Sequence, residues 1–146
     1  PAAINVISQE QLQDWRVRRI ADVIKLDASL NEAYNAVGYA EQFSLRGFPL
    51  DNAASYRKDG LPIASDASIP LENKERIDIL KGLSGLQGGV STPGGLIDFV
   101  TKRPTATPLR SILFEVSERG TVLGSVDLGG RFEDRRFGYR INAAAE

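Results

Sequence analysis

The side chains in this sequence that could most readily do chemistry are the carboxylates Asp51, Asp59, Asp66, Glu72, Glu75 and Asp78. Their spacing does not match that of a calcium-binding loop. Any two of them could act as a general acid and base, but nothing in the sequence brings one pair together. The chain also has no Cys and no His, which excludes thiol catalysis, His-based triads and metal sites built from these residue types. We therefore expect that the protein is not an enzyme.

The glycine-rich stretch 82–89, Gly-Leu-Ser-Gly-Leu-Gln-Gly-Gly, is the other segment that could hold a reactive group. It lacks the Gly-Lys-Ser/Thr ending of a phosphate-binding loop and does not have the spacing of a dinucleotide-binding loop. Ser84 does not lie in the Gly-x-Ser-x-Gly pattern of a nucleophile elbow. We interpret this stretch as tight turns between strands.

Composition and charge narrow the classes of protein further. The chain has 146 residues, 42% of them hydrophobic and 25% charged, which is enough for one domain with a core. Its net charge is −1, so it has no general attraction to nucleic acid or anionic lipid. The basic residues Arg16, Arg18 and Arg19 are interpreted as a solvated helix face. No apolar run approaches the ~20 residues that a membrane helix requires.

The two ends of the sequence suggest a piece of a longer protein. The chain begins at Pro1 without a signal peptide, and residues 141–146 end abruptly in a strand pattern. The alternative is a small complete domain with a processed N-terminus.

Several elements must position these residues, and the first part of the chain mixes helices with strands. Residues 4–7 are predicted to form a strand, and Ser8 with Gln11 has the pattern of a capping box that starts a helix. Apolar residues at helical spacing predict a second helix over 18–26. Residues 27–41 have no clear period and are predicted to be a loop.

Short alternating strands follow. The dipeptide Asp59-Gly60 favours a two-residue hairpin turn between 55–58 and 61–63. Further strands are predicted over 42–48, 75–80 and 96–102. The side chains expected in the core of this part are Ile4, Val6, Leu12, Ile20, Ile24, Leu45, Ile77, Ile79, Ile97 and Phe99.

The chain changes character after Pro108. Residues 110–118, 121–132 and 137–146 alternate between apolar and polar side chains. One face carries Ile112, Phe114, Val116, Val122, Val126, Tyr139 and Ile141. Membrane strands need about 9–11 residues with their apolar side chains turned to lipid. A soluble meander with one wet face fits the same pattern, so alternation by itself leaves both readings open.

Five segments in order resemble the plug domain of TonB-dependent outer-membrane receptors. The first is the opening strand 4–7 with the apolar pattern at 20–24, followed by Phe-Ser-Leu-Arg-Gly-Phe at 43–48. The remaining three are Tyr-Arg-Lys-Asp-Gly-Leu-Pro at 56–62, Glu-Arg-Ile-Asp-Ile-Leu-Lys-Gly at 75–82 and Thr-Pro-Gly-Gly-Leu-Ile-Asp-Phe-Val-Thr-Lys-Arg-Pro at 92–104. Their order and spacing agree over 1–105, and the last segment resembles the siderophore class. Two departures are Lys81, where arginine is usual, and a glycine-rich turn without the usual proline and tyrosine.

The resemblance implies an α+β plug domain over 1–105, a small mixed β-sheet with short helices, followed over 109–146 by the first antiparallel strands of a transmembrane β-barrel. It implies import of ferric siderophores across the outer membrane, with the plug in the barrel lumen and open to the periplasm. Iron would enter only as the siderophore chelate, so no cofactor is expected. The other expected partners are TonB, through a segment preceding residue 1, the protein's own barrel and outer-membrane lipid, but no nucleic acid.

Other functions remain open at this point. The same fold could import a vitamin or a glycan, or serve as a signalling or bacteriocin-docking receptor. An unrelated soluble binding module is a further alternative.

The resemblance also implies candidate site residues. The ligand-facing loops would contribute Tyr34, Tyr39, Asp51, Asn52, Ser65 and Asp66. The two tyrosines are the best of these, because a phenol offers a hydrogen bond and a flat face to an aromatic chelate. Arg46 and Lys81 stand where the family places cations that pair with carboxylates of the barrel wall, and we expect them to form a latch between plug and barrel.

Overall fold

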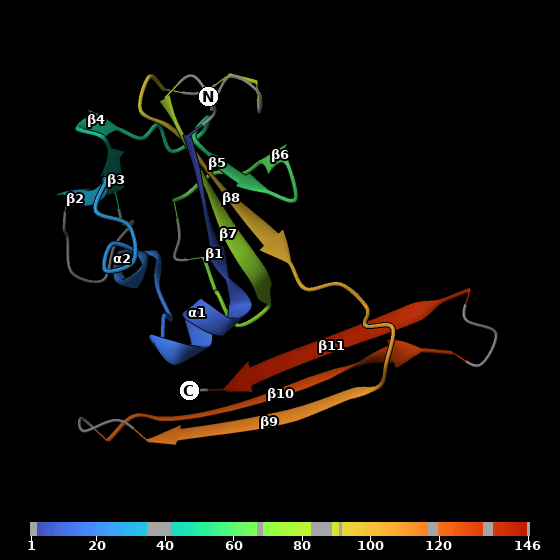
Figure 1. Ribbon diagram of the computed structural model, residues 1–146. Coiled ribbons are helices and arrows are strands. Elements are labelled where there is room, and N and C mark those ends of the chain that lie inside the picture. The colour runs from blue at the N-terminus through green and yellow to red at the C-terminus, as the bar shows by residue number, and fades with distance from the viewer. Residues whose placement is uncertain are drawn as a thin grey trace. The chain divides into compact units, whose positions relative to one another are not determined.

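A computed structural model of the protein, shown in Figure 1, describes residues 3–34, 42–66, 69–82, 89–90, 92–116, 120–132 and 136–145. The chain divides into two compact units, Pro1–Thr101 and Lys102–Glu146. Each unit is described below by itself.

The first unit is built on a five-stranded mixed sheet with the order β1-β7-β8-β5-β6. Its strands are β1 (Ala3–Ser8), β5 (Tyr56–Lys58), β6 (Leu61–Pro62), β7 (Lys74–Lys81) and β8 (Gly95–Thr101). The pair β5–β8 is parallel and the other neighbours are antiparallel. Figure 1 shows β1, β7 and β8 running side by side through the middle of this unit.

A second sheet and two short helices complete the first unit. The sheet has the order β2-β3-β4, with β2 (Leu30–Tyr34), β3 (Gln42–Leu45) and β4 (Phe48–Pro49). The helices are α1 (Gln9–Asp14) and α2 (Ile20–Val23). Over the part of the chain that the structure describes, neither length nor apolar character lets a helix cross a bilayer. The unit is therefore α+β, a small mixed sheet with few helices, as the sequence predicts.

The core forms where alternating side chains of neighbouring strands meet on one face of the large sheet. Ile77 pairs with Phe99 and Ile79 pairs with Ile97, and all four side chains are completely buried. The other buried members of the cluster are Ile7, Leu12, Val17, Ile20, Val23, Leu30, Phe43, Leu45, Leu50, Tyr56 and Leu71. Removing this much apolar surface from water is the main force that stabilises the unit.

Local sequence signals set the start of α1 and the turn between β5 and β6. Ser8 Oγ accepts a hydrogen bond from Gln11 N at 3.3 Å, while Gln11 Oε1 accepts one from Ser8 N at 3.0 Å, so the predicted capping box is confirmed. Asp59 and Gly60 have φ values of 53° and 82°, the left-handed pair that a tight hairpin turn requires, and they join β5 to β6 as predicted.

Several expectations for the first unit were wrong. Residues 27–41 are not wholly loop, because β2 pairs with β3 there, and the predicted helix 18–26 is reduced to α2. Ile4 and Val6 are about half exposed, since they lie on the face of β1 opposite to buried Ile7.

The second unit is a three-stranded antiparallel sheet with the order β11-β10-β9. Its strands are β9 (Leu109–Val116), β10 (Val122–Arg131) and β11 (Gly138–Ala145). Because Val126 stands opposite both Ile112 and Ala143, the apolar positions of all three strands share one face. That face is open, with Ile112 81% and Phe114 70% exposed.

Candidate functional site

The polar centre of the first unit is the carboxylate of Asp27, which is almost fully buried. It accepts hydrogen bonds from Ser29 Oγ at 2.6 Å, from Ser29 N at 2.9 Å and from Asn5 Nδ2 at 2.8 Å. Lys81 Nζ lies 2.9 Å from the same carboxylate and forms an ion pair with it. Asp27 therefore joins β1, the end of β7 and the segment that leads into β2.

The surroundings of Asp27 keep it ionised. Burial raises the pKa of the carboxyl, but hydrogen bonds from Ser29, Lys81 and Asn5 outweigh that effect and lower the pKa to about 2. A buried carboxylate that accepts this many hydrogen bonds is satisfied in its charged form. Lys81 is thus held by a permanent negative charge within its own unit.

Arg46 reaches the same place from a different hairpin. It does not lie in a strand, although the sequence predicted one over 42–48, because β3 ends at Leu45 and Arg46 occupies the turn to β4 with φ 56°. Its backbone N donates to Ser29 O at 2.7 Å. A Cβ on Gly82 would meet Arg46 Nη1 at 2.8 Å, so the guanidinium lies against the glycine that follows Lys81.

The structure therefore pairs Lys81 with Asp27, and it places Arg46 against the residue after Lys81 and beside Ser29, which binds Asp27. Within the described ranges, no carboxylate lies at ion-pair distance from Arg46, whose side chain is exposed. Two cations and one carboxylate leave this cluster, made of Arg46, Lys81, Asp27, Ser29 and Asn5, with an excess of positive charge. Such a surface attracts a carboxylate from outside the unit.

Four of the predicted ligand-binding residues lie on one pair of loops. Asp51 Oδ1 accepts hydrogen bonds from the N–H groups of Ala53 at 2.9 Å and Ala54 at 2.8 Å, which closes a tight turn. Ser65 N donates to Asn52 O at 2.9 Å, so the second loop is fastened to the first.

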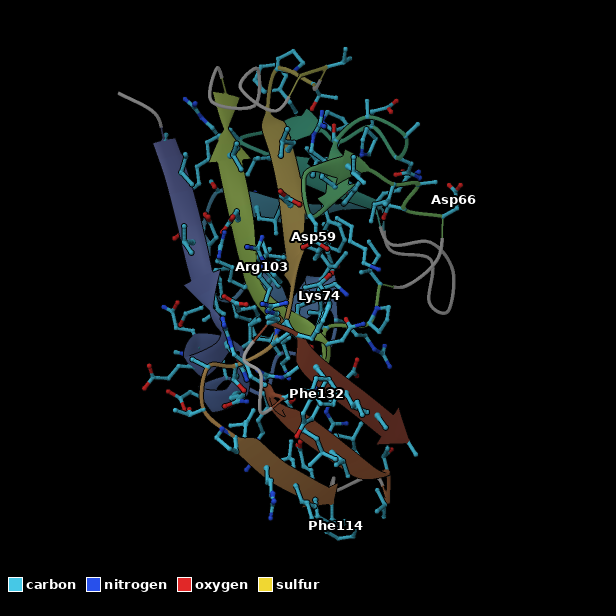
Figure 2. The ribbon with its side chains drawn as sticks, turned by 90° about the vertical axis from the view of Figure 1, so that its right-hand side faces the viewer. Asp59, Asp66, Lys74, Arg103, Phe114 and Phe132 are labelled. Carbon is cyan, nitrogen blue, oxygen red and sulfur yellow. The ribbon has the colours of Figure 1, made fainter. Side chains whose placement is uncertain are left out.

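These four residues are not equally accessible. Asp51 and Asp66 are exposed, and Figure 2 shows Asp66 pointing away from the rest of the unit. Ser65 is buried, and so is Asn52 Oδ1, which leaves these two inside the loops. Tyr34 is the last residue of β2, but its side chain, like the whole of Tyr39, lies outside the described residues.

A hydroxyl network that the sequence analysis missed connects these loops to the large sheet. Ser55 is fully buried, and its Oγ accepts from Asp51 N at 3.1 Å and donates to Thr92 Oγ1 at 3.3 Å. Ile97 N donates to Ser55 O at 2.9 Å, which ties the turn directly to β8. Only the fold brings Ser55 and Thr92 together, so no local pattern could have found this contact.

Asp27 was also missed, although a weak signal for it exists. The spacing Asp-x-Ser at 27–29 is that of a side chain that accepts from the backbone two residues later. Its ion pair with Lys81, however, spans 54 positions and has no local signature. Among the described residues, no group of three acidic side chains is placed to hold a metal ion.

Comparison with known proteins gives this geometry a context. The family described as the TonB-dependent Receptor Plug Domain matches residues 1–96. A ferrichrome receptor, FcuA, from Yersinia enterocolitica is 28% identical over 145 residues, covering 94% of this chain and 19% of that protein. A ferric-pyoverdine BN7/BN8 receptor from Pseudomonas putida is 27% identical over 119 residues, 79% of this chain and 14% of that protein.

Solved structures agree with the sequence comparison. The ferric yersiniabactin uptake receptor FyuA from Yersinia pestis superposes with a TM-score of 0.85 at 25% identity, covering 98% of this chain and 24% of that one. The ferric preacinetobactin receptor BauA from Acinetobacter baumannii gives a TM-score of 0.85 at 26% identity, covering 99% and 22%. The chain thus spans about a fifth of the length of the relatives it matches.

Proposed function

This chain belongs to the family of TonB-dependent receptor plug domains, and we propose that it is part of an outer-membrane receptor that imports ferric siderophores with energy from TonB. In this proposal, residues 1–105 are the plug and residues 109–146 are the first strands of the barrel. The observation that carries it is the family match over 1–96, together with relatives that are named as ferrichrome and ferric-pyoverdine receptors. Those relatives are receptors and transporters, which points to a family of non-enzymes.

The apolar face of the second unit supports the barrel part of the proposal. Its large side chains, Phe114 and Ile112 among them, are exposed, while Asp127 and Arg140 lie on the opposite face. A lipid-facing strand has this distribution, because apolar side chains are stable in lipid and polar ones in a watery lumen. If these strands belong to a barrel, the protein lies in the outer membrane, with the plug inside the barrel lumen and open to the periplasm.

The plug would meet the siderophore through its outward loops. Asp51 and Asp66 offer exposed carboxylates there, and Asn52 and Ser65 support the loops from inside. Tyr34 and Tyr39 remain proposed contacts for an aromatic chelate. The hydroxyl network through Ser55 and Thr92 gives these loops a rigid connection to β8, by which ligand contact would be transmitted into the sheet.

Arg46 and Lys81 would hold the plug in the barrel. The excess positive charge of their cluster suits carboxylates on the barrel wall, and pairs at a hydrated interface can be broken and remade. Lys81 is already paired with Asp27, so we assign the larger share of the external contact to Arg46. Iron itself would remain within the chelate and would not be bound by these residues.

The proposal is tested with the receptor that contains this chain. From a panel of ferric siderophores that includes ferrichrome and a ferric pyoverdine, at least one should bind to it, and a vitamin or a glycan should not displace that ligand. Uptake of radiolabelled iron should require TonB. If the receptor bound a vitamin or a glycan but no ferric siderophore, the proposed substrate class would be wrong. TonB-independent uptake would overturn the energy source.

A second candidate function is docking of a protein toxin. Relatives that are 27% identical over 136 residues are named pesticin receptors, and one superposed structure is a complex of FpvAI with pyocin S2. This function would use the same receptor and does not compete with siderophore import. Killing of cells that carry the receptor by a toxin of this class would establish it, and resistance of those cells would exclude that toxin.

A further inference from the structure

The first residues of the second unit, 102–105, are fastened to its strands by buried charges. Lys102 Nζ lies 2.8 Å from Asp127 Oδ2, and the two side chains are 8% and 13% exposed. Arg140 binds the same carboxylate with two nitrogens, Nε to Oδ1 at 2.6 Å and Nη2 to Oδ2 at 2.7 Å. Its third nitrogen, Nη1, donates to the backbone oxygen of Arg103 at 3.3 Å.

Two glycines make room for this segment, which we call the connector. A Cβ on Gly129 would lie 2.8 Å from Thr105 Oγ1, and a Cβ on Gly138 would lie 2.6 Å from Pro104 Cβ. A real Cβ would clash at the second distance, because the proline ring cannot rotate away. The polar face of β10 and β11 therefore has space for the connector at Gly129 and Gly138, and it binds the connector through the ion pair of Asp127 with Lys102.

The charges of this arrangement depend on one carboxylate. Asp127 lies between Lys102 of the connector and Arg140 of β11, so it separates two cations that would otherwise face each other. If the connector lifted away, Lys102 would lose its partner, and Arg140 would lose the Arg103 carbonyl. Charge-assisted hydrogen bonds of this length in a mostly buried place are among the strongest in proteins.

We propose that the connector is a fixed anchor, which stays docked on β10 and β11 while the rest of the plug, residues 1–101, moves during transport. The inference rests on the proposed function, and it adds the point in the chain, just before Lys102, at which the moving part of the plug begins. A displaced plug would bend the chain before Lys102, and the barrel strands would keep their hold on 102–105. Asp127, Gly129 and Gly138 are then positioning residues for transport, although they touch no ligand.

The docked state is tested by labelling the receptor next to the connector. The chain has no cysteine, so Ala106→Cys places a single thiol for a nitroxide label at the exposed position that directly follows the connector. The label should be restricted in the unmodified receptor. Asp127→Asn and Gly138→Ala should each shorten its rotational correlation time at least twofold. Gly124→Ala is the matched control, because a Cβ there meets nothing within 4 Å, and it should change nothing. A label that is equally mobile in all four proteins would overturn the anchor.

Transport is tested with a reversible lock. Thr105→Cys with Gly129→Cys should form a disulfide, whereas Thr105→Cys with Gly130→Cys should not, because Gly130 lies on the opposite face of β10. With a fixed anchor, the locked receptor should take up ferric siderophore at the unlocked rate. A tenfold loss that a reductant restores would show that the connector detaches, and would overturn the proposal. If the unmodified receptor takes up no ferric siderophore, the proposed function fails, and the label mobility alone decides the anchor.

Discussion

Lys81 and Asp27 form an ion pair at 2.9 Å across 54 positions of the chain, and this pair fastens the end of β7 to the segment before β2. The carboxylate is buried, while the lysine side chain is 21% exposed. A cation that would hold the plug in the barrel therefore also holds the plug together. Several consequences of this and of the other contacts can be measured.

Replacing Asp27 with Asn should destabilise the first unit by about 2 kcal/mol at pH 7. The folded pKa of Asp27 is about 2, against an ordinary value of 3.8, and each unit of difference corresponds to about 1.4 kcal/mol. Since the folded pKa is lowered, this stability is fully present above pH 3.8 and is lost as the pH falls towards 2. Urea denaturation of the chain at pH 7 and through this acid range measures both effects.

The matched control for that experiment is Asp66→Asn, because Asp66 is exposed. It should change the unfolding free energy by less than about 0.5 kcal/mol. The Asp27→Asn variant should also lose less stability than the unmodified chain between pH 4 and pH 2. Parallel acid profiles for the two proteins would contradict the role given to Asp27.

Lys81→Gln and Arg46→Gln should separate the two roles of the latch cluster. Lys81→Gln leaves Asp27 without its cation and should cost about 1–3 kcal/mol of stability, because the remaining charge is buried. Arg46→Gln changes an exposed side chain and should cost less than about 0.5 kcal/mol. Chemical denaturation of the single variants measures this difference.

The double variant tests the latch in the receptor. Changing Arg46 and Lys81 together to Gln should leave siderophore affinity nearly unchanged, since the ligand is expected at the outward loops. The uptake rate, or retention of the plug in the barrel, should change instead. Loss of ligand binding, with uptake that simply follows binding, would show that these residues belong to the ligand site or to the plug's own fold.

Gly95→Ala should disrupt the pairing of β7 with β8. Gly95 has φ 127°, and a Cβ there would lie 1.9 Å from Leu80 O, so alanine meets both backbone strain and a clash with the neighbouring strand. We expect a loss of at least about 3 kcal/mol. Gly60→Ala is the comparison, since Gly60 also has a positive φ of 82° but open space around it, and it should cost about 1 kcal/mol. Equal losses in thermal unfolding would argue against the clash.

Val126→Lys should impair assembly of the receptor in the membrane, and Ser125→Lys should not. Val126 lies on the apolar face between Ile112 and Ala143, whereas Ser125 lies on the opposite face. A lysine facing the middle of a bilayer costs about 2–4 kcal/mol, but one facing the lumen costs little. The amount of folded receptor in outer-membrane fractions measures the effect. If the strands formed a soluble meander instead, Ser125→Lys would impair folding more than Val126→Lys, or neither variant would impair it.

The parts of the fold that were predicted correctly depend on residues close together in the chain. The Asp59-Gly60 turn, the Ser8 capping box and the alternation of Ile77 with Ile79 all formed as expected. Turn chemistry, capping and strand period act over two to four residues, so they can be recognised without knowing the rest of the molecule.

The predictions that were wrong share a different cause. Leu30–Tyr34 has no clear period, and it is a strand because β3 pairs with it. Ile4 and Val6 have strand-forming side chains, but β1 lies with Ile7 towards the core, which leaves the other two on the outer face. In each case, a neighbour distant in the sequence decided the outcome.

The candidate site divides in the same way. The sequence by itself determined which residues could serve, because Arg46 and Lys81 lie in recognisable motifs and Asp51 and Asp66 lie in turn-forming segments. Only the tertiary structure decided that Lys81 pairs with Asp27 and that Arg46 lies against Gly82. It also decided that Ser65 is buried while Asp66 is exposed. The physical reason is that ion pairing and burial depend on distances in space. Closing a loop of 54 residues around Asp27 and Lys81 requires the whole core to form, and no local pattern records that closure.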